Sequence, residues 1–381
     1  MKSKTFRNWA FTLHRYLGLA MGFVLIIVGL TGSLLVFQKE INDFLVAQQF
    51  GHISPQEVPL SLESVVNTVK AVYDSSGNDL KLNKLYMPSV PDEPIMFAFT
   101  APNDKGIDVI VNPYTGAIMG ERSDTTLIVL LYQLHYALMA GDIGMTIVGI
   151  IAFLSLVLNI TGIILWPGWR RLIAGFKIKW NAHPKRINFD IHKVAGIIAV
   201  VFLTLTSITG FCWNFYNFTE PIIYAMTFTK QQPEPVSVPQ PGQFPLRLRE
   251  QLKIGDATLP GAMVRSISFP SKPEDSLKIS FKLPQENAER GQSNVYLDQY
   301  TGKVLRIDNA LKMPLGDRVL NSFTPLHYGT FGGLSTRILY VFVGLSPLIL
   351  FITGFVMYQH RYQEKSVRHN QVIELSKKRQ T

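Results

Sequence analysis

Four histidines occupy equivalent positions in a sequence that repeats itself. His14 begins HRYLGLAMGFVLIIVGLTGSLLVF and His192 begins HKVAGIIAVVFLTLTSITGFCWNF; each has Gly at the fourth following position and Thr-Gly at the seventeenth and eighteenth. His135 in QLHYAL and His327 in PLHYGT each precede another Thr-Gly pair by 26 and 27 positions. Two imidazoles on opposite axial positions are the ligand set of a low-spin b-type haem, so the pattern predicts two noncovalent b-type haems.

The elements that must hold these histidines are four apolar runs, at residues 17–37, 143–166, 194–215 and 338–358. Each exceeds the roughly 20 residues that cross a hydrocarbon core, and none contains a charged residue. Because backbone groups in lipid must be satisfied within their own segment, the runs predict four transmembrane helices. The first run is longer than the apolar part of a signal peptide, about 7–15 residues, and is interpreted as a retained anchor.

The distribution of charge predicts the orientation of these helices. Segments 1–13, 167–190 and 359–381 hold 15 Lys and Arg against three acidic residues, whereas segments 38–142 and 217–337 hold 20 against 24. The positive-inside rule therefore places both termini and the 167–190 loop in the cytoplasm. The net charge of +10 is then a topology signal that favours membrane lipid, not nucleic acid, as the basic segments' partner.

Eight segments follow from the apolar runs and the charge. The prediction is a cytoplasmic N-terminus with the first span (1–40), a first exported domain (41–134), the second span with its preceding histidine (135–166), a basic cytoplasmic loop (167–190), the third span (191–216), a second exported domain (217–326), the fourth span with its preceding histidine (327–358) and a cytoplasmic tail (359–381).

The two exported domains are predicted to be α+β and to repeat one another. Residues 60–73 have the pattern of an amphipathic helix, and alternating apolar runs follow it. VIVNPYTGAIMG in the first domain matches VYLDQYTGKVLR in the second, and each is typical of a strand that enters a hairpin at a glycine turn. The chain is therefore expected to be a four-helix transmembrane bundle built from two copies of span, domain and span.

In this topology His14 and His192 lie at the cytoplasmic ends of the first and third spans. His135 and His327 lie at the external ends of the second and fourth. Each membrane face thus receives one candidate ligand from each repeat. No Asp, Glu, Lys or Arg lies in the middle of a span, which favours a path for electrons over a path for ions.

Other residues near these histidines have candidate roles. Gly18 and Gly196 lie one helical turn beyond their histidines, where a side chain would meet a flat macrocycle. Arg15 is a candidate partner for a haem propionate, although an arginine at this depth also snorkels to the interface. His360 is the rival ligand for the inner haem.

The Thr-Gly pairs and the single cysteine are assigned structural roles. Small residues let transmembrane helices approach closely, so the pairs are interpreted as packing features. Cys212 is the one cysteine of the chain, which excludes an intrachain disulfide and an iron–sulfur site built on several cysteines.

The motifs together resemble the PepSY-associated transmembrane family. The resemblance rests on HRYLGL with LTGSLLVF, on NPYTG and DQYTG, on LHYAL and LHYG, and on the closing ITGFVMYQHR, and it covers essentially the whole chain. It implies two PepSY-like periplasmic domains. More narrowly, the layout is similar to the dihaem ferric-siderophore reductases, which implies haem ligation by His14, His135, His192 and His327 and reduction of an Fe(III) hydroxamate chelate.

The electron donor is not indicated by any motif. The sequence has no Gly-rich dinucleotide fingerprint and no CxxCH attachment site, so a quinol or a separate cytoplasmic reductase is expected to supply electrons. Two alternatives stay open. One is the same relay with another periplasmic acceptor, and the other is a non-redox membrane sensor or peptidase regulator, in which His135 and His327 would be dispensable.

Overall fold

The computed structural model describes residues 4–74, 79–102, 105–123, 126–239, 242–286, 288 and 290–378. The chain divides into two compact units. The membrane unit comprises Met1–Gln38, Leu130–Glu220 and Ser322–Thr381, and the sheet unit comprises Lys39–Val129 and Pro221–Asn321. Each unit therefore draws on both sequence repeats.

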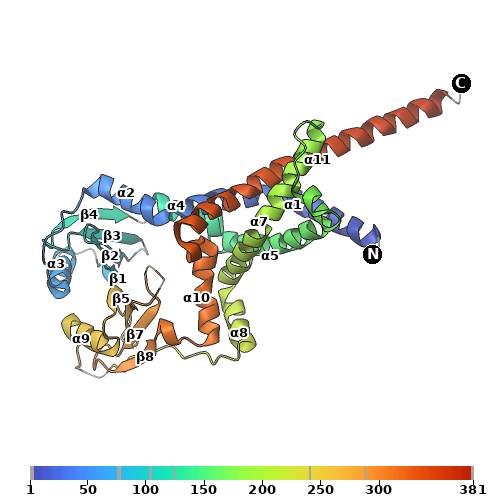
Figure 1. Cartoon of the computed structure of the whole chain (residues 1–381). Coiled ribbons are helices and arrows are strands. Elements are labelled where there is room, and N and C mark those ends of the chain that lie inside the picture. Colours follow the sequence, from blue (N-terminus) through green and yellow to red (C-terminus); the bar gives the residue numbers. More distant parts are fainter. Residues whose placement is uncertain are drawn as a thin grey trace. The chain divides into compact units, whose positions relative to one another are not determined.

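Four long helices form the membrane unit (Figure 1). They are α1 (Lys4–Leu35), α5 (Gly141–Leu165), α7 (Pro184–Asn214) and α11 (Gly333–Lys378). All four are long and apolar enough to cross a membrane. α1 packs on α5 and α11, and α7 packs on the same two helices. The prediction of a multi-pass membrane protein with a transmembrane bundle is confirmed, and the helices extend beyond the apolar runs.

Small residues set the contact between α1 and α11. A Cβ atom on Gly29 would clash with the Gly344 carbonyl oxygen, and Ser33 Oγ donates a hydrogen bond to the Val341 carbonyl at 3.0 Å. Helices α5 and α7 are joined similarly, because Ser207 Oγ donates to Ser155 Oγ at 3.1 Å. These contacts are the close approach that small residues permit in lipid.

Pro347 lies inside α11, where it cannot donate to the carbonyl of Val343. Ser346 Oγ donates to that carbonyl at 2.6 Å. The local side chain thus satisfies the backbone oxygen that proline leaves open, as helices in lipid require.

Two short helices, α4 (Leu127–Ala137) and α10 (Leu315–Tyr328), carry His135 and His327. Each ends in a tight reversal. Leu138, Met139 and Gly141 have positive φ before α5, and Gly329 and Gly333 have positive φ before α11. His135 and His327 therefore lie on helices of their own and not on the first turns of the spans.

The sheet unit contains one eight-stranded antiparallel sheet with strand order β4-β3-β2-β1-β5-β6-β7-β8 (Figure 1). Its strands are β1 (Lys81–Tyr86), β2 (Ile95–Thr100), β3 (Gly106–Val111), β4 (Ile118–Ser123), β5 (Met263–Ser268), β6 (Leu277–Lys282), β7 (Ser293–Leu297) and β8 (Val304–Asp308). The remaining helices of the chain are α2 (Gln38–Phe50), α3 (Leu62–Asp74), α6 (Leu172–Phe176), α8 (Tyr216–Met226) and α9 (Leu248–Thr258).

Each half of the sheet is an α+β repeat with its own apolar core. Phe97 and Phe99 of β2 pack with Val65 and Val69 of α3, and the second half repeats the arrangement around β6. The predicted α+β domains are confirmed. The sequence did not indicate that β1 pairs with β5, with Leu85 opposite Ile267, so that the two halves share one sheet.

The matched glycine turns connect β3 to β4 and β7 to β8. Asp298 Oδ1 accepts hydrogen bonds from the backbone N–H of Tyr300 at 3.0 Å and of Thr301 at 2.8 Å, and Gly302 follows with φ of 72°. Asn112 accepts the corresponding bonds in the first repeat. An Asx turn before a left-handed glycine is the local reason that both hairpins form here.

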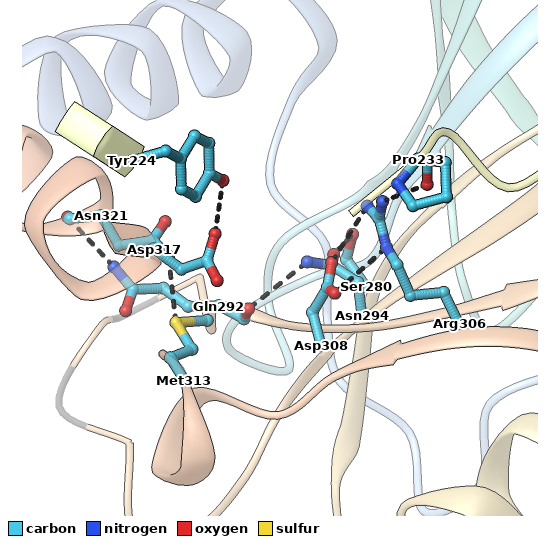
Figure 2. A network of polar contacts seen from close by, with 10 residues as sticks. All are labelled: Tyr224, Pro233, Ser280, Gln292, Asn294, Arg306, Asp308, Met313, Asp317 and Asn321. Carbon is cyan, nitrogen blue, oxygen red and sulfur yellow. Dashed lines mark hydrogen bonds and ion pairs between the residues drawn. The ribbon is translucent and has the colours of Figure 1, made fainter. Parts of the chain in front are cut away.

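Within the sheet unit, polar side chains link the flanking helices to one another and the strands of the second half to one another (Figure 2). Tyr224 OH donates to Asp317 at 2.6 Å, which joins α8 to α10. Ser280 Oγ donates to Asn294 at 2.8 Å between β6 and β7, and Arg306 pairs with Asp308 at 3.1 Å on β8.

Candidate metal centre: two crossed histidine pairs

The rings of His14 and His192 lie next to one another in the membrane unit, with their planes nearly perpendicular. Their centroids are 6.2 Å apart and their planes are inclined at 83°. His14 comes from α1 and His192 from α7, so each sequence repeat supplies one ring.

A second pair repeats this geometry. The centroids of His135 and His327 are 6.0 Å apart, and the planes are again inclined at 83°. The structure therefore brings the four predicted histidines together in the two predicted pairs, called below the 14/192 pair and the 135/327 pair.

Each ring is held by the threonine of a Thr-Gly pair. His14 Nδ1 lies 3.0 Å from Thr161 Oγ1, and His135 Nδ1 lies 3.1 Å from Thr31 Oγ1. In the second repeat His192 Nδ1 lies 3.0 Å from Thr353 Oγ1, and His327 Nδ1 lies 2.7 Å from Thr209 Oγ1. The sequence had indicated only a packing role for these pairs.

The hydrogen bonds fix the tautomer of the rings. Thr161 Oγ1 donates to the Val157 carbonyl at 2.8 Å, and the other three threonines donate in the same way to the residue four positions earlier. The hydroxyl oxygen is then left to accept, so Nδ1 carries the proton. His14 Nδ1 also lies 3.1 Å from the Leu158 carbonyl, which can only accept. Nε2 of the neutral ring therefore keeps its lone pair for a metal.

The glycine after each threonine makes room for the ring. A Cβ atom on Gly32 would lie 2.9 Å from His135 Cε1, and one on Gly162 would lie 3.3 Å from His14 Cε1. Gly354 and Gly210 stand in the same relation to His192 and His327, at 3.4 and 3.5 Å. The constant spacing from histidine to Thr-Gly was the sequence signal for this contact.

The separation of the rings fits a metal with imidazole on both axial positions. With metal–nitrogen bonds of about 2 Å and each ring centroid about 1.1 Å behind its nitrogen, two such rings lie about 6.2 Å apart. A porphyrin would supply the other four ligands, so two histidines would suffice for each site. Among the described residues there is no cluster of three or more His, Cys, Asp or Glu suited to a metal ion.

The glycines one turn beyond the 14/192 pair are not required by helix packing. A Cβ atom on Gly18 would meet Leu158 at 3.9 Å and one on Gly196 would meet Leu350 at 3.6 Å, both ordinary contacts. At Gly22, in contrast, a Cβ atom would clash with the Phe351 ring. Packing thus accounts for Gly22 but not for Gly18 or Gly196, whose bare helix faces suit a flat group.

Arg15 lies beside the 14/192 pair in sequence and has an unsatisfied donor. Its guanidinium stacks 4.5 Å from the centroid of the Tyr16 ring, and its buried Nε has no hydrogen-bond partner among the described residues. A buried arginine donor without an acceptor suits an anionic group such as a propionate.

Two other arginines flank candidate ligands in the sequence, Arg337 after His327 and Arg361 after His360. Arg337 donates to the Val36 carbonyl at 2.8 Å and so caps the end of α1. The Arg361 guanidinium stacks 5.0 Å from the centroid of the Phe11 ring. In the described part of the chain, no ring contact joins His360 to His14 or His192.

Aromatic residues adjoin the 135/327 pair. The centroid of the Trp213 ring lies 4.8 Å from that of His327 and 6.0 Å from that of Tyr328. The hydroxyl oxygens of Tyr328 and Tyr132 are 2.6 Å apart. Sequence reasoning missed Trp213 and Tyr132. Trp213 follows Thr209 by four residues, so the shared helix face was the available signal.

A buried ion cluster lies at the start of α7, next to His192. Asp190 is fully buried and pairs with Lys193 at 2.6 Å and with Arg186 at 3.1 Å. It also accepts from the Lys179 backbone N–H at 3.1 Å, which ties the basic loop to α7.

Comparison with known proteins gives one match. A family model described as the PepSY-associated TM region matches residues 11–361. No curated protein matches the chain.

Proposed function

The chain belongs to the PepSY-associated transmembrane family, and on that premise we propose that it is a dihaem b reductase that carries electrons outward across the bacterial inner membrane to a ferric siderophore. The observation that carries the proposal is the presence of two histidine pairs with crossed rings about 6 Å apart. A sensor or peptidase regulator has no need of two such pairs.

Haem would supply a reversible one-electron carrier at each pair. His14 and His192 would hold one group through Nε2, and His135 and His327 would hold the other. Gly18 and Gly196 leave room for the macrocycle against α1 and α7, and the unsatisfied Nε of Arg15 suits a propionate.

The two pairs are spaced along the bundle as a transmembrane path requires. His14 and Thr31, which holds His135, are 17 residues apart on α1, or about 26 Å at the rise of an α-helix. The excess of Lys and Arg in the termini and the 167–190 loop supports a cytoplasmic 14/192 pair and a periplasmic 135/327 pair.

The reaction at the periplasmic side adds one electron to Fe(III) in the chelate and gives Fe(II). Hydroxamate oxygens are hard donors that hold Fe(III) far more tightly than Fe(II), so this single electron releases the metal. If His135 and His327 both hold the group, the chelate would have no open coordination position there. The electron would then leave through the surroundings of the 135/327 pair, where Trp213, Tyr328 and Tyr132 lie.

The electrons would come from a quinol or from a cytoplasmic reductase. Either donor would deliver them at the 14/192 pair, whose ligands lie toward the basic ends of α1 and α7. The basic segments of the chain would contact anionic lipid at that surface.

The test uses the purified full-length protein from haem-replete cells. We expect a dithionite-reducible b-type spectrum and two haems per chain by pyridine haemochrome. Reduced protein mixed anaerobically with ferrioxamine-type chelates should be reoxidised, with Fe(II) trapped by a ferrous-specific chelator. Protein that binds no haem under these conditions contradicts the haem assignment, and haems that stay reduced contradict the acceptor.

A further inference from the structure

The four threonines that hold the histidines are more deeply buried than the rings they contact. Thr161 and Thr209 are 2 % exposed, and Thr31 and Thr353 are 5 % exposed. Each hydroxyl has both of its roles assigned, because it donates to its own helix and accepts from Nδ1 of a histidine on another helix. Such a hydroxyl fixes the direction in which the imidazole N–H points.

We propose that Thr31, Thr161, Thr209 and Thr353 are positioning residues that hold the axial imidazoles in crossed planes, so that both haems are of the crossed bis-histidine type. The proposal rests on the proposed haem function and extends it to the ligand orientation. It follows from the 83° angle between the rings in both pairs and from the repeated threonine contact.

The threonine contact restricts the orientation of the imidazole plane, in addition to accepting a hydrogen bond from Nδ1. Heavy atoms that cannot hydrogen-bond lie about 3.5–4.0 Å apart. A valine methyl group in the place of Thr161 Oγ1 could not remain 3.0 Å from His14 Nδ1. The ring would have to turn, and the neighbouring glycine leaves it the room to do so.

The orientation of axial imidazoles has a direct spectroscopic consequence. Crossed planes leave two iron d orbitals of a low-spin ferric haem nearly degenerate and give a strongly anisotropic EPR signal. Parallel planes split these orbitals and give a rhombic signal. The signal shape therefore reports ring orientation independently of activity.

The experiment compares EPR spectra of the oxidised, haem-loaded full-length protein. Two double variants each act on one pair: Thr161→Val with Thr353→Val for the 14/192 pair, and Thr31→Val with Thr209→Val for the 135/327 pair. The matching Thr→Ser variants restore the hydroxyl. Thr146→Val is the control, because its side chain also donates to its own helix, at 2.9 Å to the Asp142 carbonyl, and has no hydrogen bond to a histidine among the described residues.

We expect two strongly anisotropic signals in the wild type. Each valine double variant should convert one of them to a rhombic signal, and its serine counterpart and the Thr146→Val control should keep both. Loss of one haem in a valine variant, with retention in its serine counterpart, also supports a role of the hydroxyl.

Two results overturn the inference while leaving the haem function intact. One is a haem-loaded wild type with rhombic signals. The other is a set of valine and serine variants that behave alike. A wild-type protein without haem instead overturns the proposed function, and this inference with it.

Discussion

His14 Nδ1 lies 3.0 Å from Thr161 Oγ1 although 147 residues separate them in the sequence. The reciprocal contact joins His135 to Thr31, so α1 and the segment containing α4 and α5 each hold a histidine of the other. The second repeat does the same. The contacts to threonine thus stay within a repeat, whereas the ring pairs join the two repeats.

Replacement of both outer ligands, His135→Ala with His327→Ala, should halve the haem content. The remaining haem at the 14/192 pair should still be reduced by the donor, but reoxidation by a ferric chelate should slow by at least about tenfold, the effect of about 1.4 kcal/mol on the barrier. Haem content and stopped-flow reoxidation are the measurements. His52→Ala, an exposed residue of the sheet unit, is the control. Chelate reduction at the wild-type rate in the double variant would contradict the assignment of the 135/327 pair as the exit for electrons.

Gly18→Leu should exclude the haem of the 14/192 pair without unfolding the bundle. A Cβ atom at this position makes only an ordinary contact, with Leu158 at 3.9 Å, so the longer side chain would compete with a macrocycle for the helix face without forcing the backbone apart. We expect half of the wild-type haem content with the 135/327 haem retained. The free energy of unfolding of the apoprotein should stay within about 0.5 kcal/mol of the wild-type value, as it does for substitutions that disturb no packing. Full haem loading of Gly18→Leu would show that the macrocycle does not lie against this face.

Gly144→Ala should damage the 135/327 pair selectively. A Cβ atom here would clash with the Ala137 carbonyl oxygen, so the reversal between α4 and α5 must open and His135 must move. Overpacking of this kind costs about 1–3 kcal/mol. Gly141→Ala is the matched control: it has φ of 54° but nothing within 4 Å, so it costs only the left-handed backbone penalty of about 1–2 kcal/mol. The haem content, measured by pyridine haemochrome, should fall in Gly144→Ala and stay at the wild-type value in Gly141→Ala.

Asp298 should make the second glycine turn sensitive to acid. Burial alone would raise its pKa, but hydrogen bonds from Thr301, Val238 and Tyr300 outweigh burial and lower the pKa below its usual value. A lowered pKa in the folded state means that the stabilisation is present above about pH 4, the value of the unfolded chain, and is lost as the pH falls through the folded value.

Variants of Asp298 distinguish the role of Oδ1, which accepts from Tyr300 and Thr301, from that of Oδ2, which accepts from Val238. Asp298→Asn keeps an acceptor for Tyr300 and Thr301 but loses the charged acceptor for the Val238 N–H. We expect it to destabilise the sheet unit by about 1 kcal/mol at neutral pH, and Asp298→Ala by up to about 3 kcal/mol. Hydrogen exchange of residues 299–302 in the full chain is the measurement. Differences from wild type that persist unchanged at pH 3 would contradict the assignment.

Much of the architecture follows from local sequence signals. The four apolar runs predict α1, α5, α7 and α11 because a hydrocarbon core demands length and apolarity within one segment. The hairpins at Asn112 and Asp298 are predictable for a similar reason, since an Asx turn and a glycine act over a few residues.

The missed features depend on contacts between distant segments. The β1–β5 pairing joins strands whose sequences carry no mark of their partner. Thr31 and Thr161 look like packing residues until the helices are assembled, because the hydrogen bond to histidine exists only in the tertiary structure. Trp213 likewise gains its role only from the position of α10.

A single repeat contains one ring of each pair, so it holds half of each centre and completes neither. The arrangement has the symmetry of a homodimer contained in one polypeptide. Covalent fusion frees the two copies to diverge, which identical subunits cannot do. Trp213 stands 21 residues after His192 and packs on His327, whereas the equivalent residue after His14 is the buried Leu35. The indole contact on His327 therefore has no aromatic counterpart at the matching position of the first repeat, and in the proposed relay this asymmetry would mark the His327 side for electron exit.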